Sequence, residues 1–115
     1  MTSRTLPDDA GPIWRDLVGK TGMALIYKHS PYCGLSATAR AQVCALATVY
    51  PDLPVWQVDV VGQRGLSQQI AEDLGIRHES PQAIVLVDGA TVWTASHRGV
   101  NQAALIETVE RNRGP

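Results

Sequence analysis

The segment Met23 to Lys28 is an almost unbroken run of apolar side chains that directly follows Gly22. A run of this kind is typical of a strand that is covered on both of its faces, as central strands of parallel or mixed sheets are. The chain has 115 residues, of which 44% are hydrophobic and 18% charged, so it can bury a core of the size of one domain. We therefore expect a central strand at this point, covered by elements from the rest of the chain.

The segments around this strand alternate between helical and extended patterns. The residues that follow Cys33 are rich in Ala, Leu, Gln and Arg and contain no proline before Pro51, which predicts a long helix. The expected elements are, in chain order, a short helix that ends near Gly19, a strand at 23–28, a long helix at 33–50, a strand at 54–60, a helix through 66–76, strands at 82–87 and 91–95, and a final helix through 103–109.

The last two strands are separated by Asp88-Gly89, a dipeptide that favours a tight antiparallel turn. The resulting order, α-β-α-β-α-β-β-α, predicts an α/β fold of the thioredoxin-like type with a four-stranded mixed central sheet flanked by helices. No repeat, low-complexity tract or linker interrupts this order, so we expect one domain over residues 1–115, with 1–11 as a flexible N-terminal tail.

Composition and charge exclude several kinds of partner and compartment. The formal charge is −1, and no run of Lys or Arg supplies the positive surface that nucleic acids or anionic membranes require. Pro7, Asp8 and Asp9 stand where an export signal would be apolar, and no apolar run approaches the length of a membrane span. Two cysteines are too few for a disulfide framework. We expect a cytoplasmic protein.

Cys33 stands where the first strand leads into the long helix. A thiol at a helix N-terminus faces free N–H groups and the positive end of the helix dipole, which favour the thiolate. The alternative is that Cys33 is a small buried hydrophobe, but its position at the junction favours a nucleophile.

Cys33-Gly34-Leu35-Ser36 has the spacing of a C-x-x-C redox motif with Ser36 in place of the second cysteine. An internal disulfide between positions 33 and 36 is therefore impossible, and the mechanism implied is monothiol exchange with a mixed disulfide. Ser36 could donate a hydrogen bond to the Cys33 thiolate or could satisfy local backbone groups. Cys44 lies about 16 Å further along the same helix, too far to resolve an adduct on Cys33, so we expect it in the core.

The residue types also bear on a metal site and on one proline bond. His29, His78 and His97 lack the paired local spacing of zinc ligands, so we expect no metal site. Ser80-Pro81 precedes the third strand, and X-Pro bonds are mostly trans, which favours trans here.

Four segments of the sequence form a distinctive set: Lys28-His29-Ser30, Cys33-Gly34-Leu35-Ser36, His78-Glu79-Ser80-Pro81-Gln82 and Val92-Trp93-Thr94-Ala95-Ser96-His97. Together they resemble the monothiol bacilliredoxins, the YtxJ-like proteins of the bacillithiol system, which serve in oxidative stress. The likeness runs from about the first strand to the final helix and implies a thioredoxin-like fold. It also implies an enzyme that removes bacillithiol from S-thiolated cytosolic client proteins, with Cys33 as nucleophile, bacillithiol as co-substrate and no bound cofactor.

The resemblance also implies that Pro81 is a cis-proline facing the active cysteine, which leaves the Ser80 backbone free to pair with a substrate strand. Gly34 departs from the family pattern, in which proline usually follows the cysteine and stiffens the helix start. Bacillithiol carries malate carboxylates, so its site requires cations and N–H groups. The candidates, each of which could instead be a solvated surface group, are Lys28, His29, Arg77, His78 and His97.

Two other functions remain open from the sequence. The first is a non-catalytic thioredoxin-like binding or stress-response module that grips a partner peptide at the Ser80-Pro81 surface. The second is a glutaredoxin-like activity on glutathione adducts, which the same cysteine chemistry permits.

Overall fold

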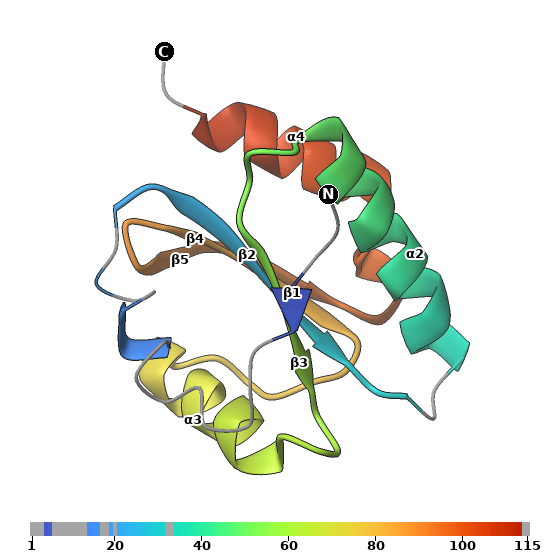
Figure 1. Ribbon diagram of the computed structural model, residues 1–115, viewed down its shortest axis with the longest axis vertical. Helices are drawn as coiled ribbons and strands as arrows, with labels where there is room; N and C mark the ends of the chain where they lie inside the picture. The colour runs from blue at the N-terminus through green and yellow to red at the C-terminus, as the bar shows by residue number, and fades with distance from the viewer. Residues whose placement is uncertain (1–3, 6–13, 17–18, 20, 32–33, 114–115) are drawn as a thin grey trace.

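A five-stranded mixed sheet forms the middle layer of the molecule (Figure 1). The computed structural model describes residues 4–5, 14–16, 19, 21–31 and 34–113. The strand order is β1-β3-β2-β4-β5; β1 and β3 run parallel to β2, β4 is antiparallel to β2, and β5 is antiparallel to β4. The strands are β1 (Arg4–Thr5), β2 (Met23–His29), β3 (Val55–Asp59), β4 (Gln82–Val87) and β5 (Ala90–Ser96).

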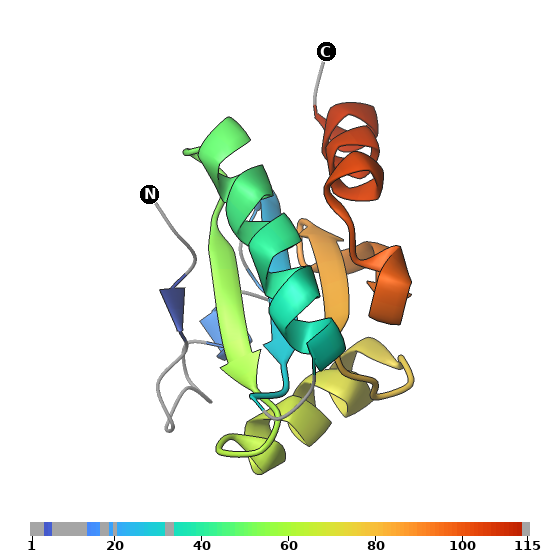
Figure 2. The same cartoon turned by 90° about the vertical axis from the view of Figure 1, so that its right-hand side faces the viewer.

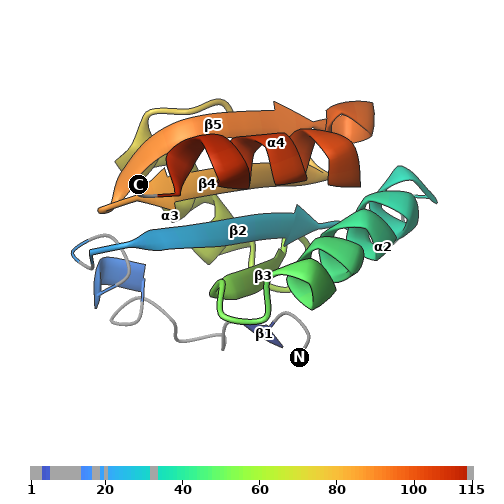
Figure 3. The same cartoon turned by 90° about the horizontal axis from the view of Figure 1, so that it is seen from above.

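Strand β2 is buried on both faces, as its apolar sequence predicts. Leu25 and Tyr27 belong to a hydrophobic cluster with α2 (Gly34–Val49) and α4 (Gln102–Asn112), whereas Ile26 belongs to a second cluster with α3 (Arg64–Leu74). Figures 2 and 3 show α2 and α4 on one face of the sheet and α3 on the other. Alternate side chains of β2 therefore point into two different cores.

The β4–β5 hairpin turns where Asp88-Gly89 predicts. Asp88 and Gly89 both have positive φ angles, 53° and 82°, as a two-residue turn of type I′ requires. The Asp88 carboxylate also accepts a hydrogen bond from the Gly22 N–H at 2.7 Å, which fastens the hairpin turn to the start of β2.

Helix α3 is capped at its C-terminus and helix α4 at its N-terminus. Gly75 ends α3 in the left-handed conformation (φ 65°), and its N–H returns to the last turn of the helix. The Asn101 side chain caps α4 by accepting a hydrogen bond from the Ala104 N–H at 2.9 Å. Among the described residues, no helix is long and apolar enough to cross a membrane.

The structure differs from the sequence-based expectations at several points of the fold. The four predicted strands are present, but the sheet has a fifth, β1, whose Arg4 and Thr5 pair with Trp56 and Gln57 of β3. These two residues belong to the stretch 1–11 that the sequence predicts to be a flexible tail, and the other residues of that stretch lie outside the described part of the chain. A 3-10 turn, η1 (His97–Gly99), follows β5 and was not predicted.

Cys44 also differs from its expected position, because it is half-buried instead of belonging to the core. Its helix neighbours Val43, Leu46 and Ala47 are buried in the α2–α4 cluster, but Cys44 lies at the edge of the buried face. Eleven residues make slightly more than three turns of a helix, so the spacing from Cys33 predicts on which side of the helix Cys44 lies. This spacing does not predict the degree of burial, which depends on the elements that pack against the helix.

Candidate active site

The junction between β2 and α2 carries the predicted chemistry. Strand β2 ends at His29 and α2 begins at Gly34, directly after Cys33 in the sequence. In Figure 3 the arrowhead of β2 points toward the start of α2. The predicted nucleophile Cys33, together with Tyr32, lies outside the described residues, so the site is built here from the groups around that position.

Ser36 ties the first turn of α2 to the end of β2. Its side chain is fully buried, and its Oγ accepts a hydrogen bond from the Ser30 N–H at 3.2 Å. The Ser36 carbonyl oxygen accepts a second bond, at 2.8 Å, from the Tyr27 hydroxyl. Of the two roles open to Ser36, the local backbone contact is therefore present. Because Oγ acts as an acceptor there, its own proton is left to donate elsewhere.

His29 completes a short chain of polar groups under α2. Its Nδ1 lies 3.0 Å from the Tyr27 hydroxyl, which gives its only proton to Ser36. Nδ1 must then donate to the tyrosine oxygen, which leaves Nε2 of a neutral His29 as an acceptor. Burial lowers the pKa of His29, and the nearby positive charge of Arg40 lowers it further, against an opposing effect of Asp59.

Lys28 points to the opposite face of the sheet and is fully buried. Its Nζ donates a hydrogen bond to the Ser67 carbonyl oxygen at 2.8 Å and lies 3.2 Å from Nδ1 of His78. The Ser67 hydroxyl is also 3.2 Å from the same Nδ1. Burial lowers the pKa of Lys28 to about 8. Lys28 is therefore held inside the protein by Ser67 and His78, and this placement does not support its prediction as a direct substrate-binding residue.

The Ser80-Pro81 bond is cis, as the family resemblance implies and against the preference for trans taken from the sequence alone. Pro81 is buried, and its carbonyl oxygen accepts a hydrogen bond from the His97 N–H at 2.9 Å. Within the described part of the chain, the Ser80 backbone N–H and C=O have no hydrogen-bond partner. The Ser80 backbone thus retains the capacity to pair with an extended peptide.

Two of the hollows that described residues line flank α2. The first, which we call the α2–η1 hollow, has a volume of about 490 Å³ and contains the predicted residue His97. The second, the His29 hollow, has a volume of about 360 Å³ and includes His29, Arg40 and Cys44. Other residues of the α2–η1 hollow are Leu35, Thr38, Ala39, Gln42, Arg98, Val100 and Asn101.

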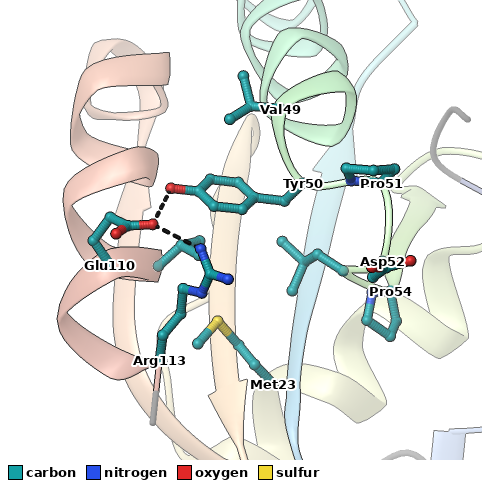
Figure 4. A pocket seen from close by; sticks show the side chains of 10 residues that line it. Met23, Val49, Tyr50, Pro51, Asp52, Pro54, Glu110 and Arg113 are labelled. Carbon is teal, nitrogen blue, oxygen red and sulfur yellow. Dashed lines mark hydrogen bonds and ion pairs between the residues drawn. The ribbon is translucent and has the colours of Figure 1, made fainter. Parts of the chain in front are cut away.

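A third hollow, of about 620 Å³, lies at the other end of β2, beside Met23 (Figure 4). There the Glu110 carboxylate accepts hydrogen bonds from the Tyr50 hydroxyl and, at 3.1 Å, from Arg113. Met23 and His29 are the first and last residues of β2, so this hollow is separated from the β2–α2 junction by the length of the strand.

Among the hollows that described residues line, none contains all five predicted cations. Lys28 and His78 are in contact, but on the α3 face, whereas His29 and His97 lie in different hollows. Arg77 is exposed, and its carbonyl oxygen accepts a hydrogen bond from the Gln82 side chain at 2.9 Å.

Two exposed arginines in these hollows were not predicted. Arg98 adjoins the predicted His97, so the dipeptide was a usable signal, whereas Arg40 carries no signal in the sequence that separates it from other surface arginines. In the part of the chain that the structure describes, no group of three or more His, Cys, Asp or Glu side chains could hold a metal ion.

Solved structures place this architecture in the thioredoxin-fold class. A solved structure described as "a putative oxidoreductase with a thioredoxin fold" superposes on this chain with a TM-score of 0.82 at 27% sequence identity, and the match covers 92% of each chain. Thioredoxin from Nicotiana alata has a TM-score of 0.75 at 14% identity, over 99% of this chain and 96% of that one. Fasciola hepatica thioredoxin has a TM-score of 0.71 at 22% identity, over 96% of this chain and 99% of that one. The predicted fold class is confirmed.

The family is narrower than the fold. Residues 14–105 match the family model of the monothiol bacilliredoxin BrxC. The matched region runs from the helical turn at Trp14 to Leu105 in α4 and contains both Cys33 and the cis Ser80–Pro81 bond. The chain belongs to the monothiol bacilliredoxin family, which confirms the resemblance and supports a thiol–disulfide redox function.

Proposed function

We propose that this protein is a monothiol oxidoreductase that removes bacillithiol, or a similar low-molecular-weight thiol, from mixed disulfides on client proteins. The observation that carries the proposal is the state of position 36. A buried serine, hydrogen-bonded to the Ser30 N–H, stands where a dithiol enzyme has its resolving cysteine. Only one sulfur is then available in the motif, which favours exchange with a mixed disulfide.

The reaction is a thiol–disulfide exchange that needs no external oxidant. The Cys33 thiolate attacks the sulfur of the small thiol, a bond forms between these two sulfurs, and the bond to the client cysteine breaks. The client leaves as a thiolate and takes a proton from water. A second molecule of the small thiol then attacks the adduct, which releases a symmetrical disulfide and regenerates the Cys33 thiolate.

The surroundings of position 33 support a reactive thiol. Helix α2 begins with the next residue, so its free N–H groups and dipole are available to a thiolate. The proton of the Ser36 hydroxyl is not used in the bond with the Ser30 N–H, so we propose it as a further donor for that thiolate. The Ser80 backbone, which has no hydrogen-bond partner among the described residues, supports the binding of the client as an extended strand.

The decisive experiment is turnover of a bacillithiolated client protein by the full chain, with bacillithiol as the resolving thiol. We expect de-thiolation by the wild type and by Cys44→Ser, and none by Cys33→Ser. The same client carrying glutathione separates the glutaredoxin-like alternative, because that activity would release glutathione at least as fast as bacillithiol. Unchanged de-thiolation in Cys33→Ser would refute the proposal.

The binding-module alternative has its own signature. A module that only grips peptides would hold a client equally well as wild type and as Cys33→Ala, and its thiol would be unreactive. We expect instead that a Cys33 adduct forms and that the client is released, so binding and reaction can be scored on the same samples.

A further inference from the structure

Lys28 is a buried cation without a carboxylate partner among the described residues. The two ion pairs found there, Glu107–Arg111 and Glu110–Arg113, are both on the exposed surface of the C-terminal segment. Lys28 Nζ contacts instead the Ser67 carbonyl oxygen on α3 and Nδ1 of His78. A fully buried lysine is costly unless its N–H groups are used, so these two contacts define what Lys28 does.

The contact with Lys28 fixes the protonation of the His78 ring. An ammonium group carries three donors and no lone pair, so toward Nδ1 it can only donate. Nδ1 of His78 must then present its lone pair, and the proton of the neutral ring is on Nε2. The Ser67 hydroxyl lies 3.2 Å from the same Nδ1, and it can donate its proton to this lone pair as well.

The second ring nitrogen of His78, Nε2, lies on the ring edge away from Nδ1. Nδ1 is held against the buried amine, His78 as a whole is exposed, and Nε2 has no hydrogen bond to another described residue, so Nε2–H can serve a ligand. His78 lies three residues before Pro81, in the segment that leads into the cis bond. Arg77, beside His78 in sequence, and Arg64, at the start of α3, are also exposed. These groups make this part of the surface favourable to an anion.

We propose that Lys28 is a positioning residue that holds His78 with its proton on Nε2, so that His78 donates a hydrogen bond to a carboxylate of the small thiol bound at Cys33. This inference rests on the proposed function and adds to it the group that recognises the thiol. It assigns that recognition to the α3 side of the site, at His78, and not to the α2–η1 hollow that contains His97 and Arg98.

The charges around His78 agree with this assignment. Burial lowers the pKa of His78, and the positive charges of Lys28 and Arg64 lower it further, against the opposing effect of Glu79. These effects favour the neutral form of the His78 ring. Lys28, with a pKa of about 8, is still mostly protonated at pH 7, which keeps it the donor in the pair.

The first test reads the His78 tautomer directly by long-range ¹H–¹⁵N NMR of the histidine rings in the full-length Cys44→Ser protein. We expect the His78 proton on Nε2. Lys28→Met should give a mixture of the two tautomers, because the donor that selects Nδ1 as acceptor is gone. A wild-type ring protonated on Nδ1 would overturn the inference, and that result does not depend on whether Lys28→Met folds.

The second test uses an adduct made chemically, by reaction of Cys33 with the disulfide of bacillithiol. The His78 Nε2–H signal should shift when the bacillithiol adduct forms and should shift much less with an adduct of cysteamine, which has no carboxylate. Equal shifts with the two adducts, or none with bacillithiol, would overturn the role of His78. Because the adduct is formed without turnover, a protein that fails to de-thiolate clients would contradict only the proposed function.

Kinetics provide the matched comparison between the two sides of the site. His78→Phe removes the donor and should raise KM for a bacillithiolated client about tenfold, more than it lowers kcat. His78→Gln keeps an N–H group near the position of Nε2 and should recover most of this loss. His97→Phe, the same change on the other side, should have the smaller effect. A larger rise in KM for His97→Phe than for His78→Phe would assign the carboxylate to the α2–η1 hollow and contradict the inference.

Discussion

The Tyr27 hydroxyl donates a hydrogen bond to the Ser36 carbonyl oxygen at 2.8 Å, across nine positions of the sequence. Tyr27 belongs to β2 and Ser36 to the first turn of α2, and both are fully buried. The bond therefore joins the two elements between which Cys33 stands, and it holds the start of the helix that is expected to stabilise the Cys33 thiolate.

Removal of this bond should lower the stability of the protein. We expect Tyr27→Phe to reduce the free energy of unfolding by about 1–2 kcal/mol, because the tyrosine oxygen also pairs with Nδ1 of His29 and both partners lose it. Urea denaturation measures the change. Tyr50→Phe is the matched control, since the Tyr50 hydroxyl binds the exposed Glu110 carboxylate, and it should cost less than about 0.5 kcal/mol. Equal losses of unfolding free energy in the two variants would show that the buried Tyr27–Ser36 bond stabilises the protein no more than the exposed Tyr50–Glu110 bond does.

Two glycines offer a test of the start of α2. A Cβ added at Gly34 or at Gly75 meets no atom within 4 Å, so space does not distinguish them. Gly75 has a φ of +65°, whereas Gly34 is helical. Gly34→Ala should therefore raise the free energy of unfolding by about 0.4–1 kcal/mol, and Gly75→Ala should lower it by about 1–2 kcal/mol. A loss of stability in Gly34→Ala, measured by urea denaturation, would mean that position 34 needs the freedom of glycine.

Burial of Lys28 makes the stability of the protein depend on pH. Its pKa is about 8 in the folded protein and near 10.5 in the unfolded chain, so between these values the unfolded chain binds more protons. The contribution of Lys28 to stability therefore rises from pH 8 to pH 10. Relative to Lys28→Met, the wild type should gain about 2–3 kcal/mol over this range, since one pKa unit corresponds to about 1.36 kcal/mol. Parallel pH profiles of the two proteins in urea denaturation would contradict the burial of a charged lysine.

The two cysteines should differ in reactivity. Cys33 directly precedes α2, whereas Cys44 is half-buried in the body of that helix, away from its N-terminus. We expect the rate at which Cys33 reacts with limiting iodoacetamide to rise with pH around a midpoint below pH ~8.5. At neutral pH, Cys33 should react faster than Cys44. Mass spectrometry of peptides after brief exposure at a series of pH values measures both rates. Equal rates for the two thiols would contradict the assignment of Cys33 as nucleophile.

Much of the fold could be predicted from local patterns. The strand at 82–87 and the Asp88-Gly89 turn are found as predicted, because an apolar run and a dipeptide that tolerates positive φ are strong local signals. The two residues of β1 could not be predicted, since their pairing with β3 depends on a distant strand and two residues carry no periodicity.

The sequence predicts which residues belong to the candidate site, but not where their side chains lie. Lysine is almost never fully buried without a partner, so Lys28 was expected at the surface, and only the contacts with Ser67 and His78 explain its burial. The cis bond before Pro81 likewise followed from the family resemblance and not from the residue types. Contacts between residues far apart in sequence decide both features, and no local pattern encodes them.

The central claim is that Cys33 takes the small thiol from a client. The most direct measurement is a single turnover in which equimolar protein and bacillithiolated client are mixed without free thiol, quenched with acid and analysed by intact-mass and peptide mass spectrometry. We predict that the client loses bacillithiol and that the peptide with Cys33 gains it, while Cys44 remains unmodified. A client that keeps its bacillithiol, or an adduct found on Cys44 instead of Cys33, would contradict the account.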